Sequence, residues 1–432
     1  MNVLIKKPGV GAPIILQSHM DMVCEKNLDS NHNFDTDPLR LRIDGDFISA
    51  DGTTLGADNG AGMAITLDIL NDDFKSVPVE ALFTTEEEST MNGVSSLDPA
   101  WFSAKRMINL DSGNEHVFTA GCAGGFRFLF SLSVRKTKED SSPYFKPSYF
   151  KIELRGLYGG HSGIEIDKGR ANALIIMARI LDELPFYVEI ADAFGGLKVN
   201  AIPREADVVI CAKVKLERLQ KELAEIEANL KKEYALTDPE LSIKCFESEE
   251  SKEKDTVLIN ANEAFIALAL MPNGVLKFNQ HMPNLVETSS NVGVLRVVET
   301  DYYGFYIEIS GASRSSSSSQ LDFLRRRIEL LALKLKARVE FSGGYPGWEY
   351  NPNSKLLAEA SAIYEKRHGR APKAVAVHAG LECGFMSEKI PGLDIISYCV
   401  EMYDYHTPKE RMSVSSLESV TAFTKELLSS LN

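Results

Sequence analysis

The order of strand-like and helix-like segments constrains the fold of this chain more than any other feature of its sequence. Over residues 1–123, short apolar segments such as PIILQSH and VEALFTT alternate with the helix-like segment AGMAITLDIL. The same rhythm returns over residues 346–432, where AVAVHAG and DIISYCV precede a final helix-like segment. Apolar strands that alternate with helices are typical of an α/β sheet. The sequence therefore predicts an α/β domain built from the two ends of the chain.

The region between these ends has a different pattern. FRFLFSLSV and YFKIELRGL read as strands with alternating polar and apolar residues, and ERLQKELAEIEANLKKEY is an amphipathic helix. Strands and helices in this order predict an inserted α+β domain with an antiparallel sheet. We expect the first part of the α/β domain at 1–123, the insert at 124–345 and the second part at 346–432.

Composition and charge exclude several classes of function. The chain has 432 residues and a formal net charge of −14, and phosphate groups would be repelled by such a surface. We therefore expect no nucleic-acid partner and no membrane partner. The sequence has no run of about eighteen apolar residues, no secretory signal pattern, and six cysteines without CxxC spacing. These features predict a cytoplasmic protein with reduced thiols.

Polar side chains of the kinds that bind metals stand where the apolar segments end. They are His19, Asp21, Asp58, Glu86, Glu87, Glu88, Asp111 and His406. Taken singly, each has a simpler explanation, as a helix N-cap, a solvated turn or a surface loop residue. Ligands gather at the carboxyl ends of strands in open α/β sheets, however, and carboxylates clustered there would repel one another. Two divalent cations remove that conflict, and histidines with a bridging carboxylate are typical ligands of a two-metal hydrolase.

A set of motifs, in one order along nearly the whole chain, resembles a known family. The motifs are HMD, TLGADNGAGMA, TTEEESTMNG, NLDSG, GCAGG, GGHSG, NAIPREA, HAGLECG and YDYHTPKE. Together they resemble the cytosolic Xaa-His dipeptidases, or aminoacyl-histidine dipeptidases, of the di-zinc metallopeptidase superfamily that also holds carnosinases, aminoacylases and carboxypeptidase G. The resemblance implies a catalytic α/β domain with a mixed central sheet. It also implies that the insert is a lid domain, through which the chain forms a homodimer.

The resemblance implies a site for two metal ions. His19, Asp58 and Asp111 would hold the first ion. The second ion would be held by Glu88, by His406 and by Asp58, which would bridge the two. Zinc is the expected metal, and manganese or cobalt would also suit these ligands.

Two further features of the metal site follow from the same resemblance. Asp21 would not bind metal but would accept a hydrogen bond from the far nitrogen of His19, which would fix the ring. The peptide bond between Asp58 and Asn59 would be cis, a form that is costly outside proline.

The reaction implied is hydrolysis of Xaa-His and related unblocked dipeptides by a metal-activated water. Glu87, aligned with the first glutamate of the family's EE pair, would be the general base and would return the proton to the leaving amine. Glu86 would be a solvated neighbour. His161, in GGHSG, would stabilise the tetrahedral intermediate from the side opposite the metals.

The remaining implied residues would bind the substrate. Arg314 would hold its carboxylate, a task suited to the guanidinium group. Asn200 would be a second contact from the lid, and the backbone of Gly380 would line the pocket. Since His161, Asn200 and Arg314 belong to the lid, we expect its closure to complete the site.

Two alternatives stay open. One is a different amidohydrolase of the same superfamily, such as an aminotripeptidase or an N-acyl amino acid deacylase. The other is a catalytically silent metal-binding or scaffold protein. Relatives begin with a helical segment before the strand NVLIKKP, and its absence here would uncover apolar surface. The retention of Glu87 beside every ligand argues against a silent site.

Overall fold

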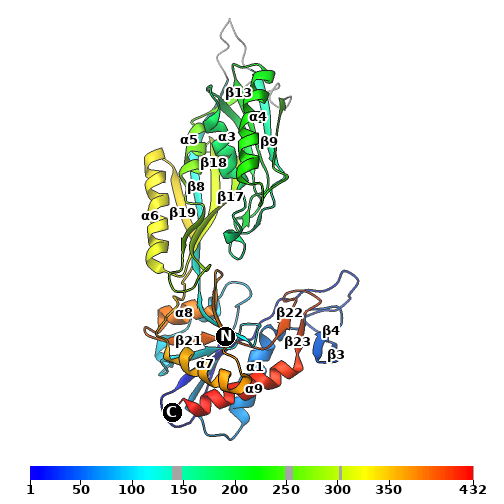
Figure 1. Cartoon of the computed structure of the whole chain (residues 1–432), viewed down its shortest axis with the longest axis vertical. Helices are drawn as coiled ribbons and strands as arrows, with labels where there is room; N and C mark the ends of the chain where they lie inside the picture. Colours follow the sequence, from blue (N-terminus) through cyan, green and yellow to red (C-terminus); the bar gives the residue numbers. More distant parts are fainter. Residues whose placement is uncertain (139–147, 249–255, 301–303, 432) are drawn as a thin grey trace. The chain divides into compact units, whose positions relative to one another are not determined.

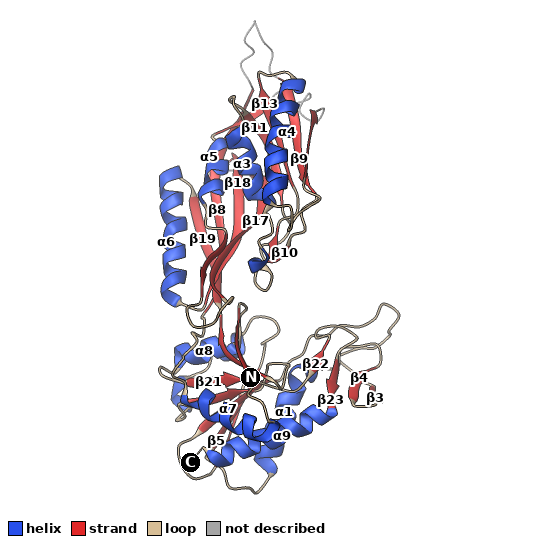
Figure 2. Cartoon of the chain, in the orientation of Figure 1, coloured by secondary structure: helices blue, strands red, loops and turns tan. Residues whose placement is uncertain are grey.

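The chain divides into two compact units in a computed structural model that describes residues 1–138, 148–248, 256–300 and 304–431 (Figures 1 and 2). Unit 1 comprises Met1–Ala123 and Pro346–Asn432, and unit 2 comprises Gly124–Tyr345. The division falls where the sequence pattern changes. The catalytic and lid roles that the resemblance assigns to these ranges stay predictions.

Unit 1 is built on a seven-stranded mixed sheet. Its strands, in spatial order, are β1 (Val3–Lys7), β5 (Val79–Thr84), β2 (Ile14–His19), β6 (Arg106–Asn109), β21 (Asp394–Ser397), β7 (Val117–Cys122) and β20 (Lys373–Val377). The four strands β5, β2, β6 and β21 are parallel, and so are β7 and β20. The strand β1 pairs with β5, and β21 with β7, in the antiparallel sense. The carboxyl ends of four neighbouring strands therefore lie at one edge of the sheet.

Helices cover both faces of this sheet (Figure 2). They are α1 (Ala57–Asn71), α2 (Asn92–Ser95), α7 (Lys355–His368), α8 (Glu382–Lys389) and α9 (Val414–Ser430). The helices α1, α7 and α9 share a core with Ile14 and Leu16 of β2, whereas α2 and α8 share a second core with Ile15. Successive side chains of a strand point to opposite faces, so β2 contributes to both cores. Burial on both faces explains why β2 and β5 lack the polar–apolar alternation of a half-exposed strand.

A separate small sheet in unit 1 holds two loops together. Its strands, in order, are β22 (Met402–Tyr403), β23 (Arg411–Ser413), β4 (Phe47–Ala50) and β3 (Leu41–Asp44), and each strand is antiparallel to its neighbour. The hairpin of β22 and β23 carries residues 404–410, whereas β4 leads into α1. The pairing of β23 with β4 therefore keeps the loop of His406 close to the start of α1.

Unit 2 is an α+β unit with an antiparallel sheet, as the sequence predicts. The sheet order is β14 (Ser242–Glu247), β9 (Ser148–Arg155), β13 (Ala206–Ala212), β11 (Glu189–Gly195), β17 (Val286–Thr300), β18 (Gly304–Ser315), β8 (Gly124–Lys138) and β15 (Thr256–Ile259), with β16 (Gly274–Phe278) beside β17 and β19 (Arg338–Tyr345) beside β8. The helices are α3 (Ala173–Glu183), α4 (Leu216–Glu233), α5 (Asn262–Leu270) and α6 (Ser318–Leu335), and they share one core with the sheet. A separate antiparallel pair joins β10 (Gly160–His161) to β12 (Ala201–Ile202). Among the described residues, no helix has the length and apolarity needed to cross a membrane.

Candidate functional site

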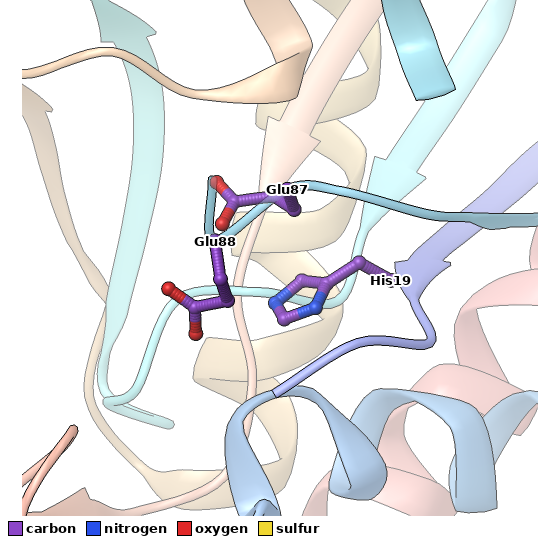
Figure 3. Close-up of side chains that lie close together, drawn as sticks. All are labelled: His19, Glu87 and Glu88. Carbon is purple, nitrogen blue, oxygen red and sulfur yellow. The ribbon is translucent and has the colours of Figure 1, made fainter. Parts of the chain in front are cut away.

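The predicted ligands meet at one edge of the unit 1 sheet. His19 is the last residue of β2, Glu87 and Glu88 follow β5, and Asp111 follows β6. Because β2 lies between β5 and β6 and runs parallel to both, these three strand ends are neighbours. Figure 3 shows the side chains of His19 and the two glutamates close together, on adjoining segments. The fold thus brings together residues that the sequence separates by up to about ninety positions.

The structure groups the ligands into two sets that share Asp58. Ligand atoms of His19, Asp58 and Asp111 form one set, and those of Asp58, Glu88 and His406 form the other. His19 Nε2 lies 3.1 Å from Asp58 Oδ1, and His406 Nε2 lies 3.4 Å from Asp58 Oδ2. Asp58 thus turns one oxygen toward each histidine, which is the arrangement required of a bridging carboxylate. These are the two sets that the resemblance implies.

The spacing and chemistry of the two sets fit divalent ions. Ligands bonded to one tetrahedral zinc at about 2.0–2.2 Å lie about 3.3–3.6 Å apart. The distances are 3.4 Å from His19 Nε2 to Asp111 Oδ1 and 3.0 Å from His406 Nε2 to Glu88 Oε1. Glu88 Oε1 is buried, and the atom beside it is His406 Nε2, so two metal-binding atoms face each other as they would around a shared ion.

The pKa values show how strongly these groups interact. Burial alone would lower the pKa of His19, but hydrogen bonds to Asp111 and Asp58 raise it to about 12. The hydrogen bond to Asp58 raises the pKa of His406 to about 9, and burial raises the pKa of Asp111 to about 8. Protons on these groups offset the repulsion between the carboxylates. A divalent ion bound by the same atoms would displace those protons.

Asp21 holds the site in a different way from the one expected. His19 Nδ1 lies 2.9 Å from the backbone carbonyl oxygen of Asp21, and its distance to the Asp21 carboxylate is 3.7 Å. The carboxylate instead accepts hydrogen bonds from the backbone N–H groups of Glu87 and Glu88, both at 3.1 Å. Asp21 thus contacts the ring through its backbone carbonyl, because the chain turns after His19 and presents that carbonyl to Nδ1. The role of Asp21 in orienting His19 stays a prediction. Asp21 ties the end of β2 to the loop after β5.

The three consecutive glutamates have different surroundings. Glu86 is exposed, and its carboxylate accepts hydrogen bonds from Thr90 Oγ1 at 2.6 Å and Asn92 Nδ2 at 3.1 Å. Glu87 lies with its carboxylate near His19 and Glu88. Burial raises the pKa of Glu87 to about 7, although the charge of His19 lowers it. A pKa of about 7 suits Glu87 to exchanging a proton near neutral pH.

The start of α1 is shaped around Asp58. The peptide bond from Asp58 to Asn59 is cis, as predicted. Asn59 Nδ2 donates to Asp111 Oδ1 at 2.8 Å, while Asn59 Oδ1 accepts from the N–H of Gly62 at 3.1 Å. A Cβ at position 62 would lie 2.3 Å from the carbonyl oxygen of Leu110, so only glycine allows α1 to approach the end of β6 this closely. This explains the last glycine of the GADNGAG motif.

Sequence reasoning missed a group of buried polar side chains beside the ligands. Gln17 Nε2 donates to Thr84 Oγ1 at 3.1 Å and to Glu382 Oε2, and Asn109 Nδ2 donates to Gln17 Oε1. These bonds link the ends of β5, β2 and β6. Gln17 and Asn109 each stand two positions before a ligand in an apolar strand, and that spacing is the signal that could have identified them.

Three of the predicted substrate-binding residues, His161, Asn200 and Arg314, belong to unit 2. The strand pair β10–β12 and a hydrogen bond of 2.9 Å from the Ser162 N–H to the Asn200 carbonyl hold the segments of His161 and Asn200 together. Burial lowers the pKa of His161, and the charge of Arg314 lowers it further. All three residues therefore lie on neighbouring segments of this unit, since β12 is hydrogen-bonded to β17 and β17 pairs with the strand of Arg314. Gly380 lies in unit 1, half-buried between β20 and α8.

The chain is similar to known proteins over nearly its whole length. A sequence model described as peptidase family M20/M25/M40 matches residues 15–430. The chain is 35% identical over 439 residues to the cytosol non-specific dipeptidase of Escherichia coli (strain K12), across 99% of this chain and 88% of that protein. It is 32% identical to the aminoacylhistidine dipeptidase of Vibrio alginolyticus, whose crystal structure matches with a TM-score of 0.91 across 100% of this chain and 88% of that chain. A tripeptidase from Staphylococcus aureus, 15% identical with a TM-score of 0.52 across 100% of this chain and 84% of that one, shares the fold alone.

Proposed function

This chain belongs to peptidase family M20/M25/M40, and from that membership we propose that it is a di-metal dipeptidase that hydrolyses Xaa-His and related unblocked dipeptides. The membership confirms the family resemblance drawn from the motifs, and the similarity in structure confirms the predicted fold class. The observation that carries the proposal is the pair of ligand sets that share Asp58, with Glu87 beside them. The names of the two dipeptidases that resemble the whole chain support the substrate class.

Glu87 is the proposed general base. Two divalent ions, most simply zinc, would supply Lewis acidity that lowers the pKa of a water toward about 7 and polarises the substrate carbonyl. The Glu87 carboxylate would accept a proton from the attacking water and would return it to the leaving amine. A pKa of about 7, caused chiefly by burial, suits both steps because neither form of the carboxyl group is strongly favoured.

His161 is suited to donate a hydrogen bond through Nε2. The backbone N–H groups of Gly163 and Ile164 lie 3.1 Å and 3.3 Å from Nδ1 and donate to it. Since Nδ1 accepts, the neutral ring carries its proton on Nε2. Burial and the charge of Arg314 lower the pKa of His161 and favour this neutral form. This supports the proposal that His161 stabilises the developing negative charge on the substrate oxygen, with Asn200 as a second contact of unit 2 and the backbone of Gly380 lining the pocket.

Arg314 is proposed to bind the substrate carboxylate. Arg314 Nη1 donates to Tyr345 Oη at 2.7 Å, while Nε is buried without a hydrogen-bond partner. We expect Arg314→Lys to raise the KM for Ala-His about 10–100-fold with a smaller change in kcat, because a charge-assisted hydrogen bond contributes about 1.5–3 kcal/mol and lysine lacks the planar fork. Steady-state kinetics at saturating zinc measure both constants.

A matched control for that variant is Arg296→Lys. Arg296 lies in the same sheet with its guanidinium 3.8 Å from the centre of the Phe194 ring, and it is not proposed to touch substrate. An unchanged KM in Arg314→Lys, or an equal rise in both variants, would contradict the proposed role of Arg314. Ala-His with an amidated C-terminus, which lacks the carboxylate, provides a second check. We expect Arg314→Lys to raise the KM for this compound much less than the KM for Ala-His.

A substrate panel tests the proposed function. The purified chain, loaded with zinc, is assayed on Ala-His, β-Ala-His, Gly-Gly-Gly and N-acetyl amino acids, with metal content measured in the same samples. We expect hydrolysis of the dipeptides and about two ions per chain. Preference for Gly-Gly-Gly would favour an aminotripeptidase, and preference for the acetylated compounds a deacylase. Two bound ions without turnover of any compound would favour the scaffold alternative.

The proposed assembly is a homodimer formed through unit 2, the proposed lid. The helix α6 of this unit exposes Phe323, Leu330 and Leu333, with exposed fractions of 57%, 44% and 72%. Exposed apolar side chains along one helix are typical of protein–protein interfaces, and light scattering in solution would measure the mass of the assembly. The cytoplasmic location expected from the sequence stays a prediction.

A further inference from the structure

Glu410 makes an unusual set of hydrogen bonds with the segment that carries Asp58. Its carboxylate accepts from four consecutive backbone N–H groups, those of Leu55 (2.8 Å), Gly56 (3.1 Å), Ala57 (2.8 Å) and Asp58 (3.3 Å). Only 2% of Glu410 is exposed. None of the ligand sets includes Glu410, and neither the sequence reasoning nor the proposed mechanism assigns it a role.

The segment 55–58 depends on an acceptor from elsewhere in the chain. The first N–H groups of a helix have no partner within it, and Gly56 adopts the left-handed conformation with φ of 69° before α1 begins. Successive N–H groups in such a turn converge on one point and favour an anion there. The carboxylate that fills this position comes from a residue more than 350 positions later in the sequence. The path of the backbone at Asp58 is therefore set by a tertiary contact.

The same residue closes the loop that carries His406. The N–H of Glu410 donates to the carbonyl oxygen of Thr407 at 3.0 Å, and Thr407 Oγ1 donates to the carbonyl oxygen of Asp404 at 2.8 Å. His406 itself has a positive φ of 56° within this turn. Residues 404–410 thus form a tight turn with His406 near one end and Glu410 at the other.

We propose that Glu410 is a positioning residue that sets the distance between the bridging Asp58 and His406, and so prepares the second metal position. The inference rests on the proposed two-metal site. The side chain of Glu410 joins the backbone of Asp58 to the turn that carries His406. Asp58 Oδ2 and His406 Nε2, the ligand atoms that these two residues supply, lie 3.4 Å apart. His19, in contrast, is held by β2 and by the carbonyl of Asp21. Loss of Glu410 should therefore lower the metal affinity of one ligand set, Asp58, Glu88 and His406. The affinity of the other set, His19, Asp58 and Asp111, should fall less.

The test is the variant Glu410→Gln, in which an amide nitrogen replaces one acceptor oxygen and the negative charge is lost. The probe is Co²⁺ alone, titrated into the metal-free full-length chain and followed by its visible absorption and by competition with a chelator. We expect the second equivalent to bind about 10–100-fold more weakly than in the wild type, as is typical when a partner behind a metal ligand is removed. The affinity for the first Co²⁺ equivalent should change much less. Activity lost at stoichiometric zinc should return when zinc is raised.

Glu80→Gln is the matched control. Glu80 is also a buried carboxylate of unit 1 that accepts from backbone N–H groups, those of Ser103 at 3.0 Å and Ala104 at 3.3 Å. It stands near the start of β5, at the opposite end from the metal ligands. A structural role alone would make both variants melt at lower temperature without a selective change in metal binding. We expect Glu80→Gln to lower the melting temperature while both Co²⁺ equivalents bind as in the wild type.

The outcomes separate this inference from the proposed function. If the wild type binds two ions and Glu410→Gln binds both with wild-type affinity, or weakens both equally, the positioning role is overturned and the two-metal site stands. If the wild type binds fewer than two ions, the two-metal site fails and the inference fails with it. Should Glu410→Gln not fold, Glu410→Asp keeps the charge and shortens the reach, and a selective weakening of the second equivalent is again the supporting result. If Glu410→Gln does not fold and Glu410→Asp binds both Co²⁺ equivalents as the wild type does, Glu410 serves folding alone.

Discussion

Replacing Glu87 with glutamine should lower kcat for Ala-His about 10²–10⁴-fold, the range typical of the loss of a general base. Glutamine has nearly the same shape as glutamate but cannot accept the proton of the attacking water. The KM should change little, because the proposed contacts of the substrate come from other residues. Bound metal should stay at the wild-type level, because Glu87 belongs to neither of the two ligand sets that share Asp58. Steady-state kinetics and elemental analysis of the same preparation measure both quantities.

Glu86→Gln is the natural control for that result. Glu86 precedes Glu87 directly, but it is exposed and its carboxylate accepts hydrogen bonds from Thr90 and Asn92. We expect near wild-type kcat from this variant. The structure also places Glu87 in a group with His19 and Glu88. A loss of bound metal in Glu87→Gln would thus show that Glu87 is a ligand, and the assignment of the general base would have to change.

Replacing Asp58 with asparagine should abolish the binding of both ions together. Asp58 Oδ1 and Oδ2 face His19 and His406 at 3.1 Å and 3.4 Å, so one side chain serves both ligand sets. An amide supplies one neutral oxygen where the bridge needs two charged ones. We expect affinity for both ions to fall by more than about 100-fold, because the loss of a residue that only supports a ligand already costs about 10–100-fold. Activity should disappear at stoichiometric zinc.

The matched control, Asp68→Asn, lies on the same helix. The Asp68 side chain is half exposed and pairs with Lys425 at 2.7 Å, on the surface of unit 1. Exposed ion pairs contribute little, so metal content and kcat should stay at wild-type values. The titration of metal-free protein with zinc, in competition with a chelator, gives the affinity of each equivalent. If Asp58→Asn lost only one ion, Asp58 would belong to one set and would not be a bridge.

The local sequence was sufficient to predict the fold class and to place the proposed ligands at the ends of apolar segments. The change from strand–helix alternation to alternating strands marks the residues at which unit 2 begins and ends, because each kind of sheet requires its own hydrophobic period. His19 and Asp111 could be placed at one edge because they stand at the ends of apolar strands, and parallel strands end on the same side. Their roles, together with those of Glu87, Arg314 and the other proposed site residues, stay predictions that the variants above test.

Only the tertiary structure decided how the ligands are held. Gln17 bonds to Glu382 across 365 positions, and Glu410 reaches the start of α1 across more than 350. Asp21 lies only two residues from His19, yet whether its carbonyl or its carboxylate faces the ring depends on the path of the chain after β2. Hydrophobic periodicity specifies which face of an element is buried, since that property is local. The partner of a buried polar group depends on which distant segments fold beside it, and no local pattern records that.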